Sequence, residues 1–552
     1  MNLKRILSLL CVGGLAMQLA AAGPESAESA ASVNSAPAGQ PLSMKDIEEL
    51  RRKIAAQQKQ IESLQKSVAE QQTLLENTVK IVAASAASTG TSVVPRLVTV
   101  GGPNAQAVQP SRVDPTANAG QKESVSPLSF KIGDADFTPF GFMDFTYFGR
   151  STNTGSGIGT GFGSIPFGNN YAGHIGESNF SAQNSRVGLR VDSKVLGAKV
   201  LGYIEADFLG NPPSNLFVTS NSDTLRLRNY FVDVKKGSLE LMAGQDWSLM
   251  VPGRRGISPL PSDLFYSQDV DTNYQLGLTW ARQAQLRVGY HPNDHFHVVL
   301  SAENPQQYVG GTGVTYPSAL TASGALGSQF NDGTTTYKVP NLHPDIIVKA
   351  AFDAKPKGLE QHIEVAGMVR SFKYFNPLPG VNHTFQTTGG GGAVNSNFEL
   401  FKGFHLIENA FFSDGGGRYI FGVGPDLVVR PDGNLSLVHA YSTVDGFEAN
   451  VSKNLMLYSY YGGAYYGRNT GIDSNGKPIG YGYTGSSSNS NRSLQEYTFG
   501  FTQTFWKAPQ YGALQLMTQY SYVWRNPWFV APGLPKNAKT NMVYVNLRYT
   551  LP

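Results

Sequence analysis

The chain of 552 residues has little cysteine and no long apolar run beyond its N-terminus. Its one cysteine is Cys11, inside the N-terminal apolar segment, so the remainder forms no disulfide and performs no cysteine catalysis. A lipoprotein anchor at Cys11 is the less favoured alternative, because leucines precede it where a small residue is expected. No stretch of about 20 apolar residues follows the signal region, which excludes a bundle of membrane-spanning helices.

Catalytic signatures are also missing from the sequence. It has no nucleophile elbow, no H-E-x-x-H and no phosphate loop, and the glycine run at 389–392 lacks the lysine of a phosphate cradle. His291, His295 and His297 are a less favoured metal site, because they flank a tight turn. The net charge of +4 is too near balance to indicate nucleic acid. We therefore expect neither an enzyme nor a cofactor.

The first residues have the pattern of an export signal. Lys4 and Arg5 precede an apolar run over 6–17, and three alanines at 20–22 follow. This order predicts a secretory signal peptide over 1–22, cleaved after Ala22.

Three segments separate the signal from the main domain. Residues 23–42 are rich in Ala, Ser, Pro and Gly and are interpreted as a flexible leader. Residues 43–83 repeat an apolar side chain every seven positions, which predicts a left-handed coiled coil rather than a lone helix. The repeat consists of Ile47, Ile54, Ile61, Val68, Leu75 and Val82. Residues 84–127 have no periodicity and are interpreted as a linker, which leaves 128–552 for the main domain.

The main domain is rich in alternating patterns. Between 186 and 247, apolar and charged side chains alternate along several short runs; Val187 and Leu189 have one parity, and Arg186 and Arg190 the other. Because successive side chains of a strand point to opposite faces, each run forms a ribbon with one apolar and one charged face. Two such ribbons also suit a soluble sandwich. Many of them behind an export signal predict an all-β transmembrane barrel around a wet, charged lumen.

Parity and turn residues predict sixteen antiparallel strands. They are expected at 137–148, 186–196, 199–208, 224–234, 238–246, 275–290, 295–304, 343–353, 361–372, 418–430, 434–441, 446–451, 454–465, 495–506, 511–524 and 540–551. Short connections fall at one end and nearly all long ones at the other, as in an outer-membrane barrel with both termini in the periplasm. The coiled coil is then periplasmic.

The last strand is among the most regular. Val543, Val545 and Leu547 are expected to face lipid, and Asn546 and Arg548 the lumen.

The expected strand 275–290 does not fit the pattern. As one continuous strand it puts Arg282 on the same face as Leu278 and Leu286. A lipid-facing charge near the membrane centre costs about 2–4 kcal/mol. Either a bulge resets the phase there, or this face is a subunit interface; the second interpretation is favoured.

Short ordered motifs give a family likeness. They are N-S-R-V-G at 184–188, G-Y-I-E-A-D-F-L-G at 202–210, L-R-L-R at 225–228, G-Q-D-W at 244–247 and H-P-D-I-I at 343–347. With the signal peptide and coiled coil, they resemble the DcaP-like outer-membrane porins. The resemblance covers most of the mature chain and is most specific between 184 and 247. It implies a trimer of sixteen-stranded barrels that passes small, mostly anionic solutes such as dicarboxylates and related organic acids.

The candidate pore residues are mainly arginines of lumen parity. On neighbouring strands these are Arg186, Arg190, Arg226 and Arg228, with Glu205 and Asp207 between them and Arg548 on the last strand. Charge at a constriction sets the selectivity of a pore, and a wall with surplus cation draws anions. The alternative is a structural lattice in which carboxylates match the arginines. An acid pair made of the two carboxylates is less favoured than wall charges.

A second candidate is the pair Arg254 and Arg255. They belong to the long segment 248–274, which has the length to fold into the barrel as a constriction loop. In that position the two arginines would bind passing anions and select for them. The alternative is an external loop that binds lipopolysaccharide phosphates or water.

The function expected from these patterns is passive, anion-preferring diffusion. Expected partners are anionic solutes, outer-membrane lipid and lipopolysaccharide, and a homotrimer. An oligosaccharide channel would need lumen aromatics, of which Tyr460 and Tyr544 are too few. A structural tether to the cell wall through the coiled coil and an outer-membrane lipase are the remaining, less favoured functions.

Overall fold

The computed structural model describes residues 126–210, 221, 223–265, 267–310, 313–327, 329–331 and 339–552. The signal peptide expected over 1–22, the leader over 23–42, the coiled coil over 43–83 and all but the end of the linker over 84–127 lie outside the described residues. None of the helices within these described ranges is long and apolar enough to cross a bilayer.

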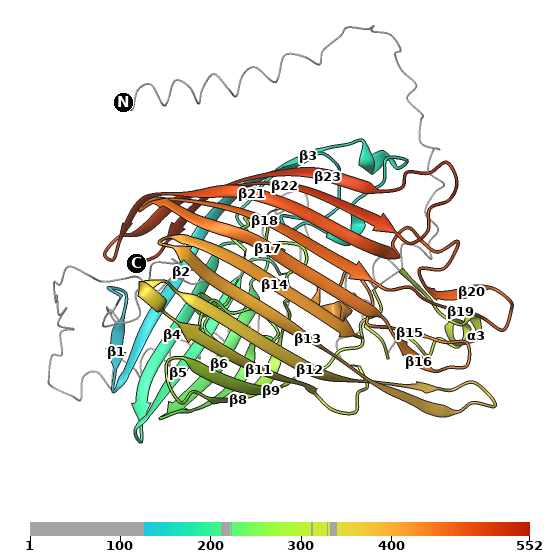
Figure 1. The fold of residues 1–552 in the computed structure, drawn as a ribbon, viewed down its shortest axis with the longest axis horizontal. Helices are drawn as coiled ribbons and strands as arrows, with labels where there is room; N and C mark the ends of the chain where they lie inside the picture. Colours follow the sequence, from blue (N-terminus) through green and yellow to red (C-terminus); the bar gives the residue numbers. More distant parts are fainter. Residues whose placement is uncertain are drawn as a thin grey trace, which may run out of the picture. The chain divides into compact units, whose positions relative to one another are not determined.

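Sixteen antiparallel strands close into a barrel (Figure 1). Closure depends on the first long strand, β2 (Ala135–Arg150), which pairs with neighbours on both edges. Phe137 lies opposite Val191 of β4 on one edge, and Tyr147 lies opposite Val545 of β23 on the other. The predicted strand number is therefore confirmed.

The other fifteen wall strands follow in chain order. They are β4 (Arg186–Val195), β5 (Ala198–Asp207), β6 (Arg226–Lys236), β7 (Leu239–Trp247), β8 (Arg282–Tyr290), β9 (Phe296–Glu303), β11 (Asp345–Ala354), β12 (Gln361–Asn376), β13 (His383–Phe401), β14 (Phe404–Asp414), β17 (His439–Ser452), β18 (Leu455–Tyr466), β21 (Asn491–Ala508), β22 (Gly512–Pro527) and β23 (Ala538–Thr550). Short connections such as 237–238, 402–403 and 453–454 lie at one end. The long segments 151–185, 248–281 and 304–344 lie at the other.

Shorter strands and helices lie beside the wall strands or in the loops between them. β1 (Phe130–Ile132) and β3 (Glu177–Ser181) pair with β2. Two small sheets form among the long loops, from β10 (Val314–Thr315), β20 (Pro478–Tyr481) and β19 (Asn469–Ile472), and from β15 (Leu427–Val429) and β16 (Leu435–Leu437). The remaining elements are α3 (Ser318–Ala322), η1 (Phe162–Ser164), η2 (Tyr171–Gly173), η3 (Pro261–Asp263), η5 (Pro356–Gly358) and η6 (Gly417–Tyr419).

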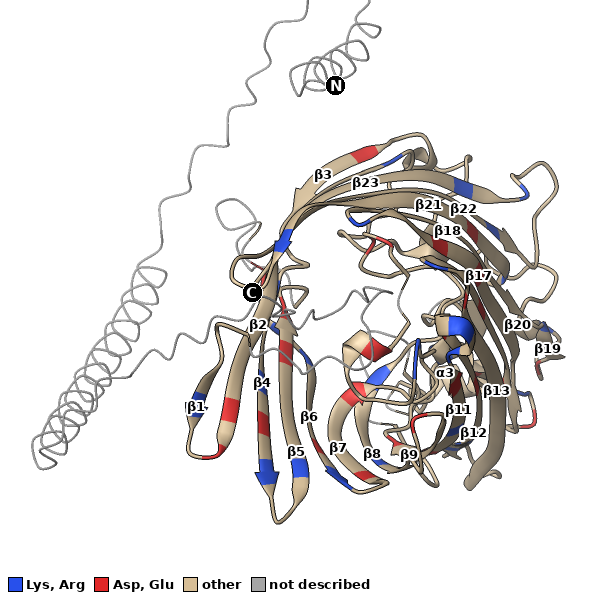
Figure 2. Cartoon of the chain, turned by 60° about the vertical axis from the view of Figure 1, so that its left-hand side comes forward, with Lys and Arg blue, Asp and Glu red and all other residues tan. Residues whose placement is uncertain are grey.

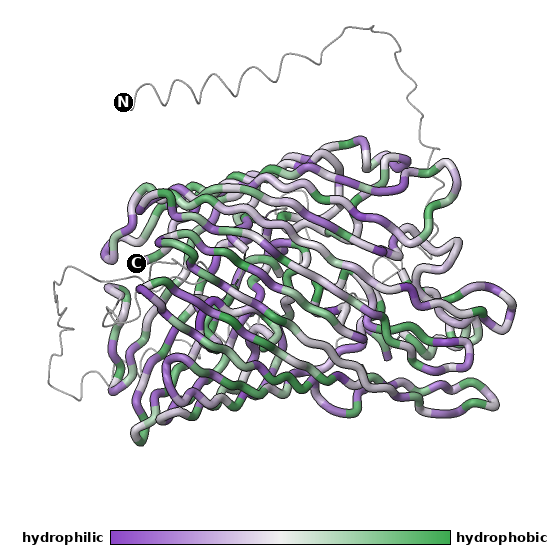
Figure 3. Tube along the Cα trace, viewed as in Figure 1, coloured by the Kyte–Doolittle hydropathy of each residue, from purple (hydrophilic) through white to green (hydrophobic). Residues whose placement is uncertain are grey.

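Side chains alternate between the two faces of the wall as expected. In β23, Leu547 is 45% exposed on the outside, and its neighbour Arg548 is 5% exposed on the inside. Leu227 and Arg228 of β6 divide in the same way. The alternation of apolar and polar residues is visible along the strands (Figure 3). An apolar outer face with charge inside is the pattern of a membrane barrel.

One predicted strand is not part of the wall, two predicted strands fall on the single strand β17, and two wall strands, β13 and β14, were not predicted. The segment 373–417, expected as a loop, contains the end of β12 and all of β13 and β14. The glycine run at 389–392 lies within β13. A Cβ on Gly391 would come within 2.4 Å of the Phe412 carbonyl oxygen of β14, so the close strand approach requires glycine there. Four glycines in succession carry no hydropathy signal, which is why parity missed this strand.

The segment 418–430, expected as a wall strand, lies instead in the loop between β14 and β17. Tyr419, Ile420 and Val428 are fully buried in the apolar cluster within the barrel. Burial on all sides makes such a run continuously apolar, and a continuous run resembles a strand in sequence. The expected strands 434–441 and 446–451 are also wrong as separate wall strands, because β17 covers the end of the first and all of the second. Residues 435–437 of the first form β16 in the preceding loop.

The expected strand 275–290 is shorter than predicted. β8 begins at Arg282, and residues 275–281 finish the preceding loop. Leu276 and Leu278 are buried inside the barrel and do not face lipid. Within β8 Arg282 still has the parity of the exposed Leu286, but its guanidinium carbon lies 5.0 Å from the ring centre of the buried Trp247. The charge therefore does not face lipid, and a subunit interface is not needed to explain it.

Candidate pore constriction

The loop between β7 and β8, residues 248–281, lies inside the barrel; we call it the inner loop (Figure 2). Its backbone reaches wall strands far away in sequence. The Gly253 amide donates to Glu364 of β12 at 2.9 Å, and the Val270 amide donates to Gln519 of β22 at 2.6 Å. The Leu276 amide donates to Glu496 at 2.8 Å. The inner loop thus crosses the lumen, and the external-loop alternative is wrong.

Arg254 anchors the inner loop to the wall. Its guanidinium donates to both carboxylate oxygens of Glu448 on β17, at 2.9 and 2.6 Å, and Tyr460 donates to the same carboxylate at 2.6 Å. Nearby, Lys349 donates to Glu364 at 2.8 Å and to the Val251 carbonyl at 2.6 Å. We call Arg254–Glu448 and Lys349–Glu364 the anchor pairs. All four groups are buried and each charge is matched, so Arg254 is not available to a solute.

Arg255 has a different position. Its side chain is half exposed and donates to Asp263 of the same loop at 2.8 Å. The negative charge of Asp263 raises the pKa of Arg255. The residue lines a cavity of about 630 Å³ at the short-turn end, together with His291 and His297.

The three candidate metal-binding histidines do not converge on one point. His291 and His297 share a hydrogen bond between their Nδ1 atoms at 2.9 Å, and His295 bonds the Asp353 carbonyl. Among the described residues, no group of three His, Cys, Asp or Glu side chains has the arrangement of a metal site.

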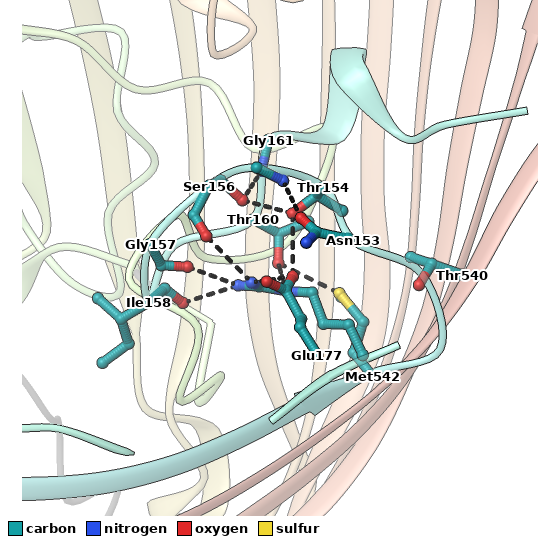
Figure 4. A network of polar contacts seen from close by, with 12 residues as sticks. Asn153, Thr154, Ser156, Gly157, Ile158, Thr160, Gly161, Glu177, Thr540 and Met542 are labelled. Carbon is teal, nitrogen blue, oxygen red and sulfur yellow. Dashed lines mark hydrogen bonds and ion pairs between the residues drawn. The ribbon is translucent and has the colours of Figure 1, made fainter. Parts of the chain in front are cut away.

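The first long loop, residues 151–185, forms a network of polar contacts around the end of β2 (Figure 4). Arg150, at the end of β2, donates to Glu177 and to Tyr544 at 2.8 Å each, and to the carbonyls of Gly157 and Ile158. The Thr160 amide then donates to Asp271 of the inner loop at 3.1 Å. Both loops are therefore held together on one side of the lumen.

The wall beside β2 has an arginine cluster, which we define as Arg186, Arg226, Arg228 and Arg282 with Glu205 and Asp207. Arg228 donates to both carboxylates at 2.6 Å. Arg226 donates to Asp207 at 3.0 and 2.8 Å, and Arg186 reaches Glu205 at only 3.5 Å. The predicted arrangement on neighbouring strands brings these side chains together. Four guanidinium groups face two carboxylates, so two positive charges are unmatched.

A β-bulge shapes this cluster. Glu205 lies opposite Asn229, while the next residue, Ala206, lies opposite Leu227, so Arg228 is the extra residue of β6. A bulge redirects side chains and is common beside functional sites. Here it lets Arg228 and Asn229 both face inward. The guanidinium carbon of Arg228 lies 5.6 Å from the centre of the Trp247 ring.

The other two candidate arginines are matched one to one. Arg190 donates to Asp192 on its own strand at 2.7 and 2.9 Å. Arg548 donates to Asp144 of β2 at 2.9 Å and lies 3.9 Å from the Phe142 ring centre. Both face the lumen as predicted, but neither adds net charge.

Sequence reasoning missed three members of this region. Glu448 and Asp144 lie far along the chain from Arg254 and Arg548, so no local pattern pairs them. Arg282 was placed on the outside by strand parity. The sequence signal that could have identified Arg282 is a charged residue within a run of apolar residues.

The two lumen tyrosines do not present their rings. Tyr460 and Tyr544 are fully buried and bond Glu448 and Asp271 respectively. They stabilise the loops and form no aromatic surface along which a sugar would move.

No protein-family model matches the chain, and no curated protein matches it. Among solved structures, the outer-membrane channel DcaP of Acinetobacter baumannii aligns over 76% of this chain and 99% of its own length. The TM-score is 0.55 at 18% sequence identity. This chain has the fold of DcaP. The DcaP-like barrel implied by the sequence motifs is therefore confirmed as a fold.

Two further structures share lower similarity. The anion-selective porin from Comamonas acidovorans covers 75% of this chain and 99% of its own, at a TM-score of 0.42 and 12% identity. OprB of Pseudomonas putida covers 75% of this chain and 94% of its own length, at a TM-score of 0.40 and 12% sequence identity. At these scores neither adds to the fold assignment made with DcaP.

Proposed function

We propose that this chain is a passive outer-membrane channel for small solutes that prefers anions. The single observation that supports the preference is the excess of two guanidinium groups over carboxylates in the arginine cluster. Arg226 is the most open member, with 39% of its side chain exposed. Unmatched positive charge in a narrow lumen raises the local concentration of anions and lowers that of cations.

The proposal includes a location and an assembly. The apolar outer face of the wall supports insertion in a bilayer, with the short-turn end in the periplasm. The expected export signal and periplasmic coiled coil over 43–83 belong to the same proposal, as does a homotrimer. Contacts with lipopolysaccharide, and with the cell wall through the coiled coil, are parts of it that rest on sequence alone.

The proposal is tested by electrophysiology on the purified full chain in planar bilayers. Under a KCl gradient, the sign of the reversal potential gives the permeability ratio of Cl⁻ to K⁺. We expect chloride to be the more permeant ion. A cation preference would overturn the proposed selectivity, and an absence of conductance would overturn the channel itself.

A further inference from the structure

Arg282 is the member of the arginine cluster that sequence parity placed outside. It is the first residue of β8 and lies opposite Trp247 of β7 in the strand register. Its guanidinium carbon lies 5.0 Å from the centre of the Trp247 ring. Arg228 lies over the same ring, with its guanidinium carbon 5.6 Å from the ring centre. The side chain therefore turns into the lumen at the point where the inner loop becomes a strand.

The other arginines of the cluster use their donors on carboxylates. Arg226 and Arg228 each make two hydrogen bonds to Asp207 or Glu205, and Arg186 makes a weaker one. Across the part of the chain that the structure describes, Arg282 makes no hydrogen bond and no ion pair. The residue is of intermediate burial, and none of its three nitrogens is a fully buried atom without a partner.

Trp247 holds this guanidinium in place. The ring is 1% exposed and is itself fixed by Tyr274, at 6.4 Å, and Trp280, at 5.6 Å between ring centres. A cation over an aromatic ring is attracted to the ring face without using its N–H donors. Arg282 is thus positioned and charged, with its hydrogen-bonding edge free.

We propose that Arg282 is the specificity-determining residue that reads carboxylate in this channel, which rests on the proposed function. A planar guanidinium presents paired N–H donors that match the two oxygens of a carboxylate, whereas chloride takes only a point charge. An organic acid that passes the cluster is bound at Arg282 in a bidentate pair and then released. The residue would therefore favour small carboxylates over chloride, beyond the general preference for anions.

The test distinguishes the effect of the paired N–H donors from the effect of the positive charge. Arg282→Lys keeps the positive charge but removes the paired donors. We expect the acetate-to-chloride permeability ratio, from bi-ionic reversal potentials with potassium salts, to fall about fivefold, as for the loss of one net hydrogen bond. The chloride-to-potassium ratio of the same variant should stay near that of the unmodified chain.

The matched control is Arg418→Lys, which changes a nearby arginine whose donors are already used. Arg418 bonds Gln283, the residue next to Arg282, and lies 3.7 Å from Asp345. Its acetate-to-chloride ratio should not change. The inference is overturned if Arg282→Lys leaves that ratio unchanged, or if Arg418→Lys lowers it equally. A chain without any chloride preference contradicts the proposed function instead, so the two failures are distinguishable. Retention of the heat-modifiable folded band in gel electrophoresis shows that each variant is assembled.

Discussion

Two groups of charges lie inside the same barrel, and they differ in balance. The anchor pairs match each cation with one carboxylate, and all four side chains are buried. The arginine cluster has four cations for two carboxylates, and Arg226 and Arg282 are only partly buried. A balanced, buried pair holds a loop in place and gives little net field. An unbalanced, wet cluster gives a net field that acts on passing ions.

The comparison also separates two arginines that were both expected to attract anions, one on a strand and one in a loop. Arg254 was expected to read anions, yet both of its terminal nitrogens are bound to Glu448. Arg226, expected as one wall charge among several, keeps an exposed edge. Lumen parity alone does not distinguish a structural charge from a selective one; the number and burial of its partners do.

The largest expected effect comes from breaking an anchor pair. Arg254→Met leaves Glu448 buried without its cation, which costs about 3–5 kcal/mol. We expect the variant to lose its folded, heat-modifiable band at a lower temperature than the unmodified chain, and its conductance to become noisier as the inner loop loosens.

The matched variant is the double change Arg254→Met with Glu448→Leu. Replacing both members of a buried pair with apolar residues is often close to neutral. The band of the double variant should therefore survive to nearly the normal temperature. Equal losses in the single and double variants would show that the pair is not the anchor.

The next largest effect is a change in ion selectivity with no change in the stability of the barrel. Arg226→Gln removes an exposed charge of the arginine cluster, while Asp207 keeps Arg228 as a partner. One unit charge about 4 Å away in water is worth about 1 kcal/mol, so the chloride-to-potassium permeability ratio should fall about fivefold. The folded band should be unaffected.

Lys131→Gln is the control for this change. Lys131 is an exposed cation on β1, paired with Asp136 at 3.6 Å, and is not among the cluster residues. Its removal should leave the permeability ratio unchanged. If Lys131→Gln lowers the ratio as much as Arg226→Gln, the preference comes from overall charge and not from the cluster.

The smallest effect has the opposite sign. Glu205→Gln removes one of the two carboxylates and increases the excess of positive charge. Because Glu205 is buried behind the arginines, its charge acts from farther away, and we expect the chloride-to-potassium ratio to rise only about twofold. A fall in the ratio would mean that Glu205 mainly holds Arg228 in position.

The wall was predictable because each strand separates lipid from water. Because of this separation, apolar and polar side chains alternate along strands such as β4 and β23. The number of strands was predicted from that alternation. The alternation fails where a side chain meets protein on both sides, as at 418–430, or where there are no side chains, as at 389–392. These two causes account for the errors at 418–430 and 389–392.

The candidate site was predictable only in part, for a related reason. Arg226 and Arg228 come from regular strands, so parity placed them in the lumen. Arg282 has the parity of the exposed Leu286, and its position over the buried Trp247 ring has no local signal in the sequence. The partners that neutralise Arg254 and Arg548 lie far along the chain, and long-range pairing has no local signature.

The most direct test of the account compares two double variants of the full chain under one KCl gradient. Arg226→Gln with Arg282→Gln removes the unmatched charge, whereas Arg254→Gln with Glu448→Gln removes a matched pair. The account predicts that the first variant loses its chloride preference and that the second, once assembled, keeps it. A chloride preference that survives the first change and disappears in the second would contradict it.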